Sequence, residues 1–456
     1  MFSSNSYPRF RSSLPKAIPL SSRTQIECMD SGLRSVAGAS FLPSHIIELI
    51  LSRRMVTKLI LGNNTLSDDG CILLFTFLSS PLGRRYPISE ISLNANRIGD
   101  RGLAAIAAYL VENTTLTELF LQDNLFTSDS NTVTQFTHAV NHSHLRVLSL
   151  TNNRSLNDDF CRLLFPALCS RYLCELHLSA IGLTHRSALY IAEYITSASR
   201  CRLQILKCNG NNLEFRGVRK IIRAIERANF GLTVVELYSN NITSGQDSED
   251  TDDDPNGRTK TYSPDAWKNT EGLLKQVLGR NSHLKKETWR EALQLLVYSR
   301  AILLHSKDPF NYDDFAHSSV STAGFPFMHL PMEIQLYVLS FLSPTLSSSQ
   351  RARIYTYASS SSTLPPLLPS LSSSSTSSAE PAVFSMCVPD PSVTMGITAN
   401  LRASPVWALN NTFGDGGCAP GKCMGKKSLL CHLEKRRTAW LEQVGCLTYD
   451  PVTEMV

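Results

Sequence analysis

Four cysteines and one histidine near the C-terminal end are the residues best suited to metal chemistry. Cys418 and Cys423 are followed by Cys431, His432 and Cys446. Together they offer enough sulfur and imidazole for one tetrahedral zinc ion. Structural zinc sites usually pair their ligands across about two to four intervening residues, and only the first two cysteines meet this spacing. We therefore predict no metal site and no other cofactor.

The familiar signatures of catalysis are missing as well. The chain contains no glycine-rich phosphate loop, no GxSxG motif and no HExxH motif. These motifs mark phosphate binding, serine nucleophiles and zinc hydrolases. We predict from this that the chain has no catalytic residues and is not an enzyme.

A leucine-rich motif runs through the first half of the chain. Its first copy is Val56-x-x-Leu59-x-Leu61-x-x-Asn64-x-Leu66, and seven copies start about 28 to 32 residues apart, at positions 56, 88, 116, 145, 173, 203 and 232. Asparagine occupies the same place in five of them, at positions 64, 96, 124, 211 and 240. A motif that returns in phase at this period indicates a repeat protein.

Each copy predicts one strand followed by one helix. In Ile91-Ser92-Leu93 successive side chains point to opposite faces of a strand, and the asparagine that follows can satisfy backbone groups of neighbouring turns. Apolar residues then recur at helical spacing, and such units are stable only when they are stacked. The expected fold class is α/β, a leucine-rich repeat solenoid. We expect a horseshoe with parallel strands on its concave side, helices on its convex side, a helical cap and a partly disordered C-terminal region.

The repeat period and the phrase Asn96-Arg-Ile-Gly-Asp-Arg-Gly102 resemble the ribonuclease-inhibitor-like family of leucine-rich repeat proteins. The resemblance covers roughly residues 42–284, a little over half of the chain. Ran GTPase-activating proteins belong to the same group, so the resemblance implies binding or activation of a small GTPase as one function. One fold hosts many functions, which leaves other functions open.

Ran-type activators steady phosphate charge on the GTPase with an exposed arginine and an asparagine near an early repeat. Arg97, Arg101 and Arg154 lie in loops after strands, with Asn94 and Asn96 nearby. The family places its arginine in a loop extension that this chain does not show. We therefore assign no residue of this chain to that role.

Changes in composition divide the chain into five predicted regions. Residues 247–254 form a dense acidic block, which we interpret as part of an insertion between the last strand and a helix over 267–278. Thr288-Trp-Arg-Glu291 reads as a capping box that opens a separate helix. The regions are a disordered tail (1–41), the solenoid (42–284) with an acidic insertion (245–264), a helical cap with an F-box-like helix (285–344), a Ser/Pro-rich low-complexity segment (345–399) and a small cysteine-containing element (400–456).

The segment Leu330-Pro-Met-Glu-Ile-x3-Val-Leu-x-Phe-Leu342 resembles the opening helix of an F-box. That resemblance implies a substrate receptor of a cullin ubiquitin ligase. Leu330, Ile334, Val338 and Leu342 would form the apolar face of the helix. The other interpretation is an amphipathic helix that packs against the cap of the solenoid.

Charge and cysteine usage bound the remaining possibilities. The net charge is +5 and is spread along the chain, and no basic block with interleaved aromatics supports nucleic-acid binding. Several cysteines fall within the repeats, where a free thiol acts as a small hydrophobe. The sequence shows no secretory signal and no apolar run that could span a bilayer. We predict no membrane partner and a location in the cytoplasm, the nucleus or both.

The concave face remains as the candidate site, and its partner is predicted to be a protein. Glutamates and two aromatic residues share this face, which favours a basic protein or a small GTPase. The predicted partner-binding residues are Lys58, Glu90, Ser92, Glu118, Phe120, Gln122, Glu175, His177, Lys207, Glu236 and Tyr238. The leading hypothesis is a non-catalytic intracellular binding scaffold. The alternatives are a Ran-type GTPase activator or small-GTPase-binding regulator, and an F-box-like ligase receptor.

Overall fold

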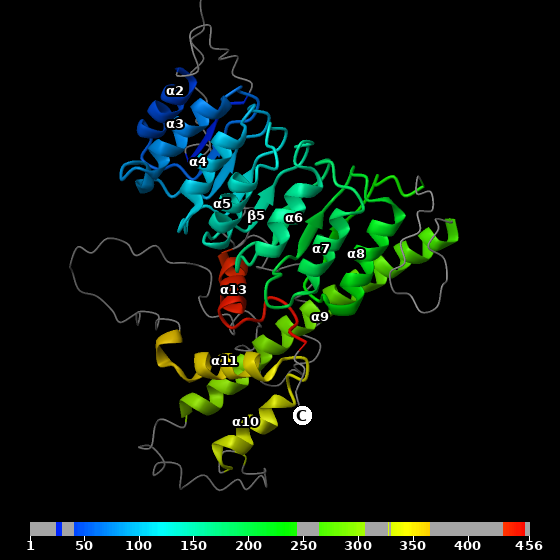
Figure 1. Cartoon of the computed structure of the whole chain (residues 1–456). Coiled ribbons are helices and arrows are strands. Elements are labelled where there is room, and N and C mark those ends of the chain that lie inside the picture. The colour runs from blue at the N-terminus through cyan, green and yellow to red at the C-terminus, as the bar shows by residue number, and fades with distance from the viewer. Residues whose placement is uncertain are drawn as a thin grey trace, which may run out of the picture. The chain divides into compact units, whose positions relative to one another are not determined.

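An open parallel sheet organises the first part of the protein. The computed structural model describes residues 24–29, 41–243, 264–305, 327, 330–364 and 432–451. Two compact units divide the chain at residues 278 and 279. In the first unit, eight described strands pair in sequence order: β1 (Gln25–Glu27), β2 (Lys58–Ile60), β3 (Glu90–Ser92), β4 (Glu118–Phe120), β5 (Val147–Ser149), β6 (Glu175–His177), β7 (Ile205–Lys207) and β8 (Val234–Glu236) (Figure 1). The predicted α/β solenoid is confirmed.

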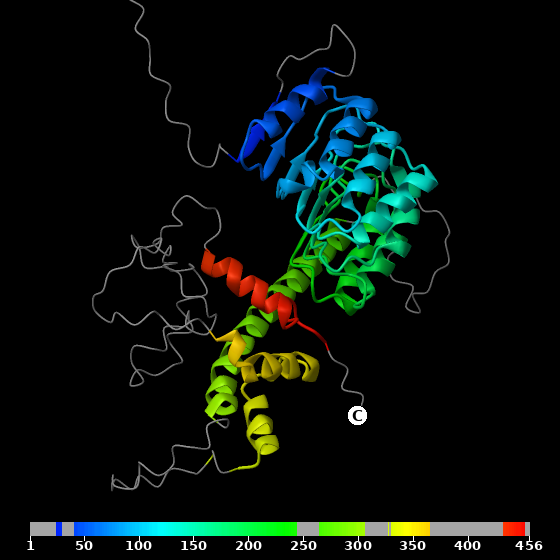
Figure 2. The same ribbon diagram turned by 90° about the vertical axis from the view of Figure 1, so that its left-hand side faces the viewer.

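Helices cover one face of this sheet. They are α2 (Phe41–Leu51), α3 (Ser67–Ser79), α4 (Asp100–Leu110), α5 (Ser130–Asn141), α6 (Asn157–Ala167), α7 (Ser187–Thr196) and α8 (Glu214–Ala228), and a short 3-10 helix, η1, spans Gly83–Arg85. Figure 2 shows the repeat helices stacked on one side of the strands. In α8, Val218, Ile221 and Ile225 are buried at three- and four-residue spacing, so one stripe of the helix faces the sheet.

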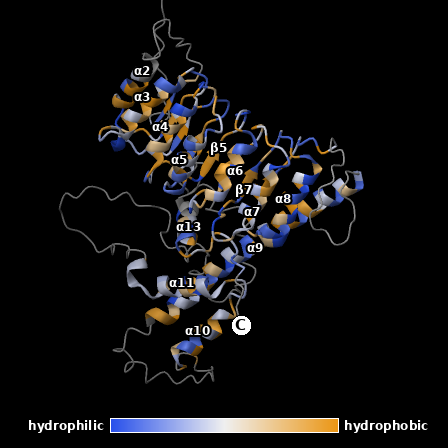
Figure 3. Ribbon diagram, viewed as in Figure 1, coloured by the Kyte–Doolittle hydropathy of each residue, from blue (hydrophilic) through white to orange (hydrophobic). Residues whose placement is uncertain are grey.

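The core of the first unit lies between the sheet and the helices. The central residue of each repeat strand is buried, as with Leu59, Ile91 and Leu119, while its two neighbours point to the other face. Figure 3 shows hydrophobic residues, in orange, along the strands and interleaved with hydrophilic residues on the helices. Each repeat therefore buries its apolar residues against those of its neighbours.

Buried asparagines connect most of the repeats to the repeat before them, while one repeat carries Ile181 at the equivalent position. The Asn96 side chain is fully buried. It donates from Nδ2 to the carbonyl oxygens of Leu61 (2.8 Å) and Asn94 (3.1 Å) and accepts at Oδ1 from the backbone of Asn64 (3.3 Å) and Leu66 (3.2 Å). Asn124, Asn153, Asn211 and Asn240 make equivalent bonds. These amides satisfy buried backbone groups that no regular strand pairing reaches.

Two element boundaries differ from the sequence prediction. Residues 25–27 lie in the sheet as β1, paired with β2, whereas a tail was expected over 1–41. Helix α9 runs without a break over Pro264–His305, whereas we expected a helix over 267–278 and a new one at the Thr288 capping box. Thr288 is buried inside α9. The Ser/Thr-x-x-Glu pattern was therefore misread, because it lies within a helix that begins upstream. The acidic block at 247–254 lies outside the described residues.

The second unit is helical. It contains the later part of α9, α10 (Met332–Ser340), α11 (Ser348–Ser359), a 3-10 helix η4 (Ser361–Thr363) and α13 (His432–Gln443). Its core includes Leu296, Leu339, Ile354 and Leu441. The capping box of this unit lies at Ser347 and Gln350, and the Gln350 side chain donates to the carbonyl oxygen of Gly445 (2.8 Å). The low-complexity region expected from residue 345 therefore includes the structured helix α11.

Several predictions on the second half of the chain remain predictions. Cys418, Cys423 and Cys431 lie outside the described residues, while Cys446 is buried in the core of the second unit. Burial raises the pKa of the Cys446 thiol to about 12, which disfavours the thiolate that binds metals. The F-box-like assignment is not tested by the fold, although α10 is present.

Replacing Asn96 by alanine tests the asparagine ladder. Asn96→Ala should reduce the free energy of unfolding by about 1–3 kcal/mol, because buried backbone groups lose their partners. Thermal or urea unfolding measures this loss. Asn131→Ala is the matched control, since Asn131 is exposed and its side chain accepts only from Gln135. Equal losses of stability in the two variants would contradict the role of the ladder.

Candidate functional site

The candidate site is the face of the sheet that the repeat helices leave uncovered, which we call the open sheet face. Strand register aligns its outward residues into two rows. The first row is Gln25, Lys58, Glu90, Glu118, Val147, Glu175, Ile205 and Val234, and the second is Glu27, Ile60, Ser92, Phe120, Ser149, His177, Lys207 and Glu236. Neighbours in a row lie on adjacent strands, about 4.8 Å apart.

The rows bring the predicted residues together on one surface. Ten of the eleven predicted residues have half-exposed or exposed side chains, as the alternation of the strands predicts. They lie either in these two rows or just after a strand. Ser92 differs because it is buried. Its register neighbours are Ile60 and Phe120, both of which have much larger side chains.

Gln25 and Glu27 belong to the same face, and the sequence analysis missed them. They extend the two rows from Lys58 and Ile60 onto β1. The leucine motif is absent around Gln25-Ile26-Glu27, which is why the strand was not recognised. The available signal was weak: Ile26 precedes Leu59 by roughly one repeat period and is flanked by polar residues.

An unpaired carboxylate lies near the middle of the first row. Lys58 and Glu90 form an ion pair. Glu118 is next to Glu90 in the row, and among the described residues it has no hydrogen-bond or ion-pair partner. Partial burial raises the pKa of Glu118; the negative charges of Glu90 and Glu175 raise it further, while Lys58 opposes the shift. A cation supplied by a partner would lower the energy of this carboxylate.

The charges nearer β8 are paired within the protein. His177 Nε2 lies 2.7 Å from Glu175 Oε1, and Lys207 Nζ lies 3.5 Å from Glu236 Oε1. Asn209 also donates to Glu236 at 2.7 Å. These pairs are partly exposed, so their net contribution to stability is small. Glu118 therefore remains the residue of this face whose charge is not compensated by a partner among the described residues.

Phe120 gives this part of the face an apolar centre. It is half-exposed and lies in register between Ser92 and Ser149, so small residues border the ring on both sides. Gln122 donates to Ser149 Oγ at 3.1 Å. Tyr238 is 70% exposed, near the end of the sheet. An aromatic ring surrounded by polar groups is typical of protein-binding surfaces.

Two loop arginines after strands carry positive charge beside this face. Arg97 and Arg154 are exposed, and neither guanidinium has a partner among the residues that the structure describes. Arg101 contacts Asp69 at 3.2 Å. The amides of Asn96 and Ile98, on either side of Arg97, both donate to Asn124 Oδ1 at 3.1 Å. The backbone at Arg97 is therefore fixed while its side chain is free to meet a ligand.

Burial keeps two cysteines of the repeats from acting as nucleophiles or metal ligands. Burial raises the pKa of the Cys201 thiol to about 11 and that of Cys208 to about 12, so both are protonated near neutral pH. The described part of the chain contains no group of three potential metal ligands. Within the same residues, no helix combines the length and the apolar character that crossing a membrane requires.

Comparison with known proteins finds a similar protein of known class. The chain matches no family model. It is 24% identical over 208 residues to the Rho GTPase-activating protein gacW of Dictyostelium discoideum. The matched segment is 44% of this chain and 17% of that relative, so the chain spans less than a fifth of the relative's length.

This match corrects one prediction. We expected no enzyme, because the sequence carries none of the common catalytic motifs. The relative is named as a GTPase-activating protein, which contradicts that expectation. A GTPase-activating protein acts by positioning groups and placing positive charge at the phosphates of the nucleotide bound to the GTPase, so its sequence need not carry a catalytic motif.

The raised pKa of Glu118 predicts that this residue lowers the stability of the fold at neutral pH but not at acidic pH. Below about pH 4.5, the ordinary pKa of glutamate, the Glu118 carboxyl is protonated in both the folded and unfolded states and does not reduce stability. As the pH rises through the raised pKa, stability is lost. Glu118→Gln should therefore raise the melting temperature at pH 7 and leave it unchanged near pH 3. Glu193→Gln, at an exposed site on α7, is the control. Equal behaviour of both variants across this range would contradict the assignment.

Proposed function

We propose that this chain regulates a small GTPase, with the open sheet face as its binding surface. The match to a Rho GTPase-activating protein carries the proposal. The solenoid agrees with it, because stacked repeats present extended surfaces for protein partners. We further assign the repeats to the ribonuclease-inhibitor-like leucine-rich class, the group to which Ran-type activators belong.

The chemistry of the face suits a partner with basic groups. The first row carries Glu90, Glu118 and Glu175, and among the described residues only the outer two have partners. A lysine or arginine of the GTPase, placed against Glu118, would neutralise the remaining charge. Phe120 beside it would supply the apolar contact that holds the complex together.

Activation requires positive charge at the phosphates of the nucleotide. An arginine from an activating protein stabilises the charge that develops in the transition state of GTP hydrolysis. Arg97 fits this role because it is exposed, unpaired among the described residues and carried by a loop that Asn124 holds in place. Its left-handed backbone (φ 55°) recurs at the equivalent Thr65 and Asn241, so this conformation belongs to the repeat turn.

Single-turnover hydrolysis of GTP tests the activating role. With a panel of Rho-family GTPases and Ran, the full chain should accelerate hydrolysis on at least one, and Arg97→Ala should reduce that acceleration by about a thousandfold. Arg154→Ala, at the other unpaired loop arginine, reports whether the role lies there instead. Arg101→Ala is the control, because Arg101 already contacts Asp69. The absence of acceleration on every GTPase would contradict activation.

Binding tests the surface separately from catalysis. Phe120→Ala should weaken binding of the responsive GTPase by about 2 kcal/mol, since aromatic anchors near the centre of an interface commonly cost this much. Glu118→Lys should slow association most at low salt, where charge steering is strongest. Leu189→Ala, at an exposed position of α7, is the helix-side control and should bind normally. Surface plasmon resonance measures both rates, and a loss confined to Leu189→Ala would place the interface on the helices.

A role on small GTPases is consistent with the cytoplasm or nucleus, where the chain was predicted to reside. That location remains a prediction. The F-box-like role also remains a prediction.

A further inference from the structure

Helix α10 exposes an unusual amount of apolar side chain. Tyr337 is 64% exposed and Phe341 is 66% exposed. Ile334, Val338 and Leu342 are exposed on the same short segment. At 100° per residue these five side chains fall on one side of the helix. We call them the α10 patch, and contiguous exposed apolar surface of this kind marks an interaction site.

The α10 patch is distinct from the side of α10 that holds the second unit together. Leu339 and Gln335 are buried, and Met332 and Leu336 pack against the core. The sequence predicted an apolar face made of Leu330, Ile334, Val338 and Leu342. The last three belong to the α10 patch and are exposed, so this apolar face is not the side that packs against the core. The helix carries two apolar sides, and its own unit covers only one of them.

A shallow pocket borders the α10 patch. It lies between α10 and α11 and has a volume of about 340 Å³. Leu336, Tyr337, Ala352 and Tyr355 contribute to its lining, and Tyr355 donates its hydroxyl hydrogen to the carbonyl oxygen of Leu336 (3.1 Å). Tyr337 belongs to both the pocket and the patch and packs edge-on against Phe341, with ring centroids 5.1 Å apart. Pocket and patch therefore form one continuous surface.

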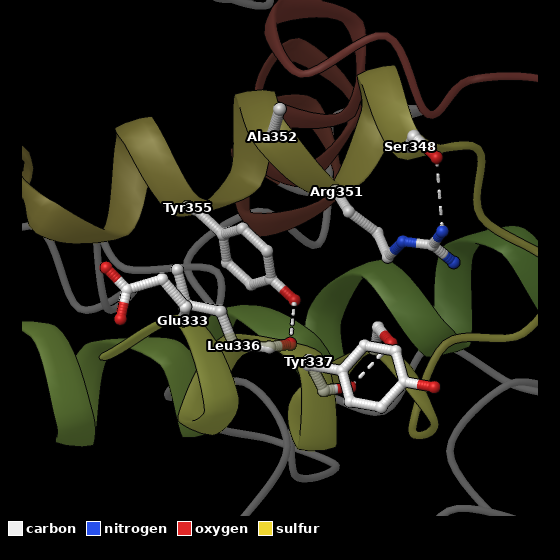
Figure 4. Close-up of a pocket in the computed structure, with 8 residues that line it drawn as sticks. Glu333, Leu336, Tyr337, Ser348, Arg351, Ala352 and Tyr355 are labelled. Carbon is white, nitrogen blue, oxygen red and sulfur yellow. Dashed lines mark hydrogen bonds between the residues drawn. The ribbon is translucent and has the colours of Figure 1, made fainter. Parts of the chain in front are cut away.

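Opposite charges mark the two ends of this surface. Figure 4 shows Glu333 at one end of the pocket and Arg351 at the other. Arg351 donates to the carbonyl oxygens of Ser343 (3.3 Å) and Leu346 (2.9 Å), which are neutral acceptors. Within the described residues, neither charge has an ion-pair partner. An occupant that carries a cation opposite Glu333 and an anion opposite Arg351 would complement both ends.

We propose that the occupant is a second copy of this chain, with its α10 antiparallel to the first. A two-fold axis through the α10 patch places Glu333 of each copy opposite Arg351 of the other, so one surface supplies both complementary charges. The antiparallel arrangement also opposes the two helix dipoles favourably. Phe341 of each copy then approaches the pocket of the other.

Such a dimer is expected to be weak. The α10 patch lies on a helix of nine residues, so each copy buries less than the roughly 800 Å² of a standard interface. We expect reversible association with a dissociation constant of about 1–100 µM. This inference does not rest on the proposed GTPase role, because the α10 patch and the open sheet face are carried by different units of the chain.

Sedimentation equilibrium of the full chain tests the proposal. Wild-type protein should show a monomer–dimer equilibrium up to about 100 µM, and Phe341→Asp should raise the dissociation constant by about tenfold or more, since each dimer carries the change twice. Leu125→Asp, at a residue of the first unit that is similarly exposed, is the control and should dimerise like the wild type. A wild-type chain that remains monomeric over this range overturns the proposal.

A charge exchange tests the antiparallel arrangement and guards against a variant that misfolds. Glu333→Arg and Arg351→Glu, each alone, place like charges opposite one another and should weaken the dimer. The double variant restores the pairing and should recover most of the association, with circular dichroism confirming that all three retain their helices. Single variants that weaken the dimer without recovery in the double variant would overturn the arrangement, as would single variants without effect.

Discussion

Buried asparagine side chains set the spacing on which the rest of the first unit depends. The Asn96 amide, for example, donates to the carbonyl oxygen of Leu61 and accepts from the backbone N–H of Asn64, both in the preceding repeat. It also donates to Asn94 in its own repeat. The backbone groups concerned lie beyond the three-residue strands, where no sheet ladder satisfies them. Loss of such a bond leaves a buried polar group unpaired, which costs more than the bond itself contributes. Where the asparagine is present, this constraint holds its repeat in a fixed position against the repeat before it.

Register, in turn, decides what the open sheet face looks like. Because equivalent residues align in rows, a glutamate at one position lies directly beside a glutamate of the next repeat, as Glu90 and Glu118 do. Like charges in direct opposition on adjacent strands destabilise a sheet. The protein offsets one of them with Lys58 and leaves the other without a counter-charge among the described residues. A surface with this uncompensated negative charge is well suited to binding, because a positively charged group of a partner can neutralise it.

The sequence was informative wherever the repeat pattern alone fixes the position of a residue. Leu59, Ile91 and Asn96 could be placed because period and alternation fix their direction. Residues that depend on distant contacts could not be placed. Gln25-Ile26-Glu27 forms a strand only through pairing with β2, and the Thr288 pattern reads as a helix start unless the helix upstream is known. In α10 the period shows two apolar sides, but only the core of the second unit decides that Leu339 is inside and Val338 outside. The proposed function was the least predictable part, because an activating arginine leaves no sequence motif.

Hydrogen–deuterium exchange on the full chain, with and without a Rho-family GTPase loaded with a non-hydrolysable GTP analogue, tests the central claim most directly. It reports where the partner lies without any substitution. The account predicts slower exchange in peptides that cover β3, β4 and β5 and the loop that carries Arg97, with little change on α6 and α7. Protection confined to the repeat helices or to the second unit, in a complex shown to form, would contradict the assignment of the open sheet face.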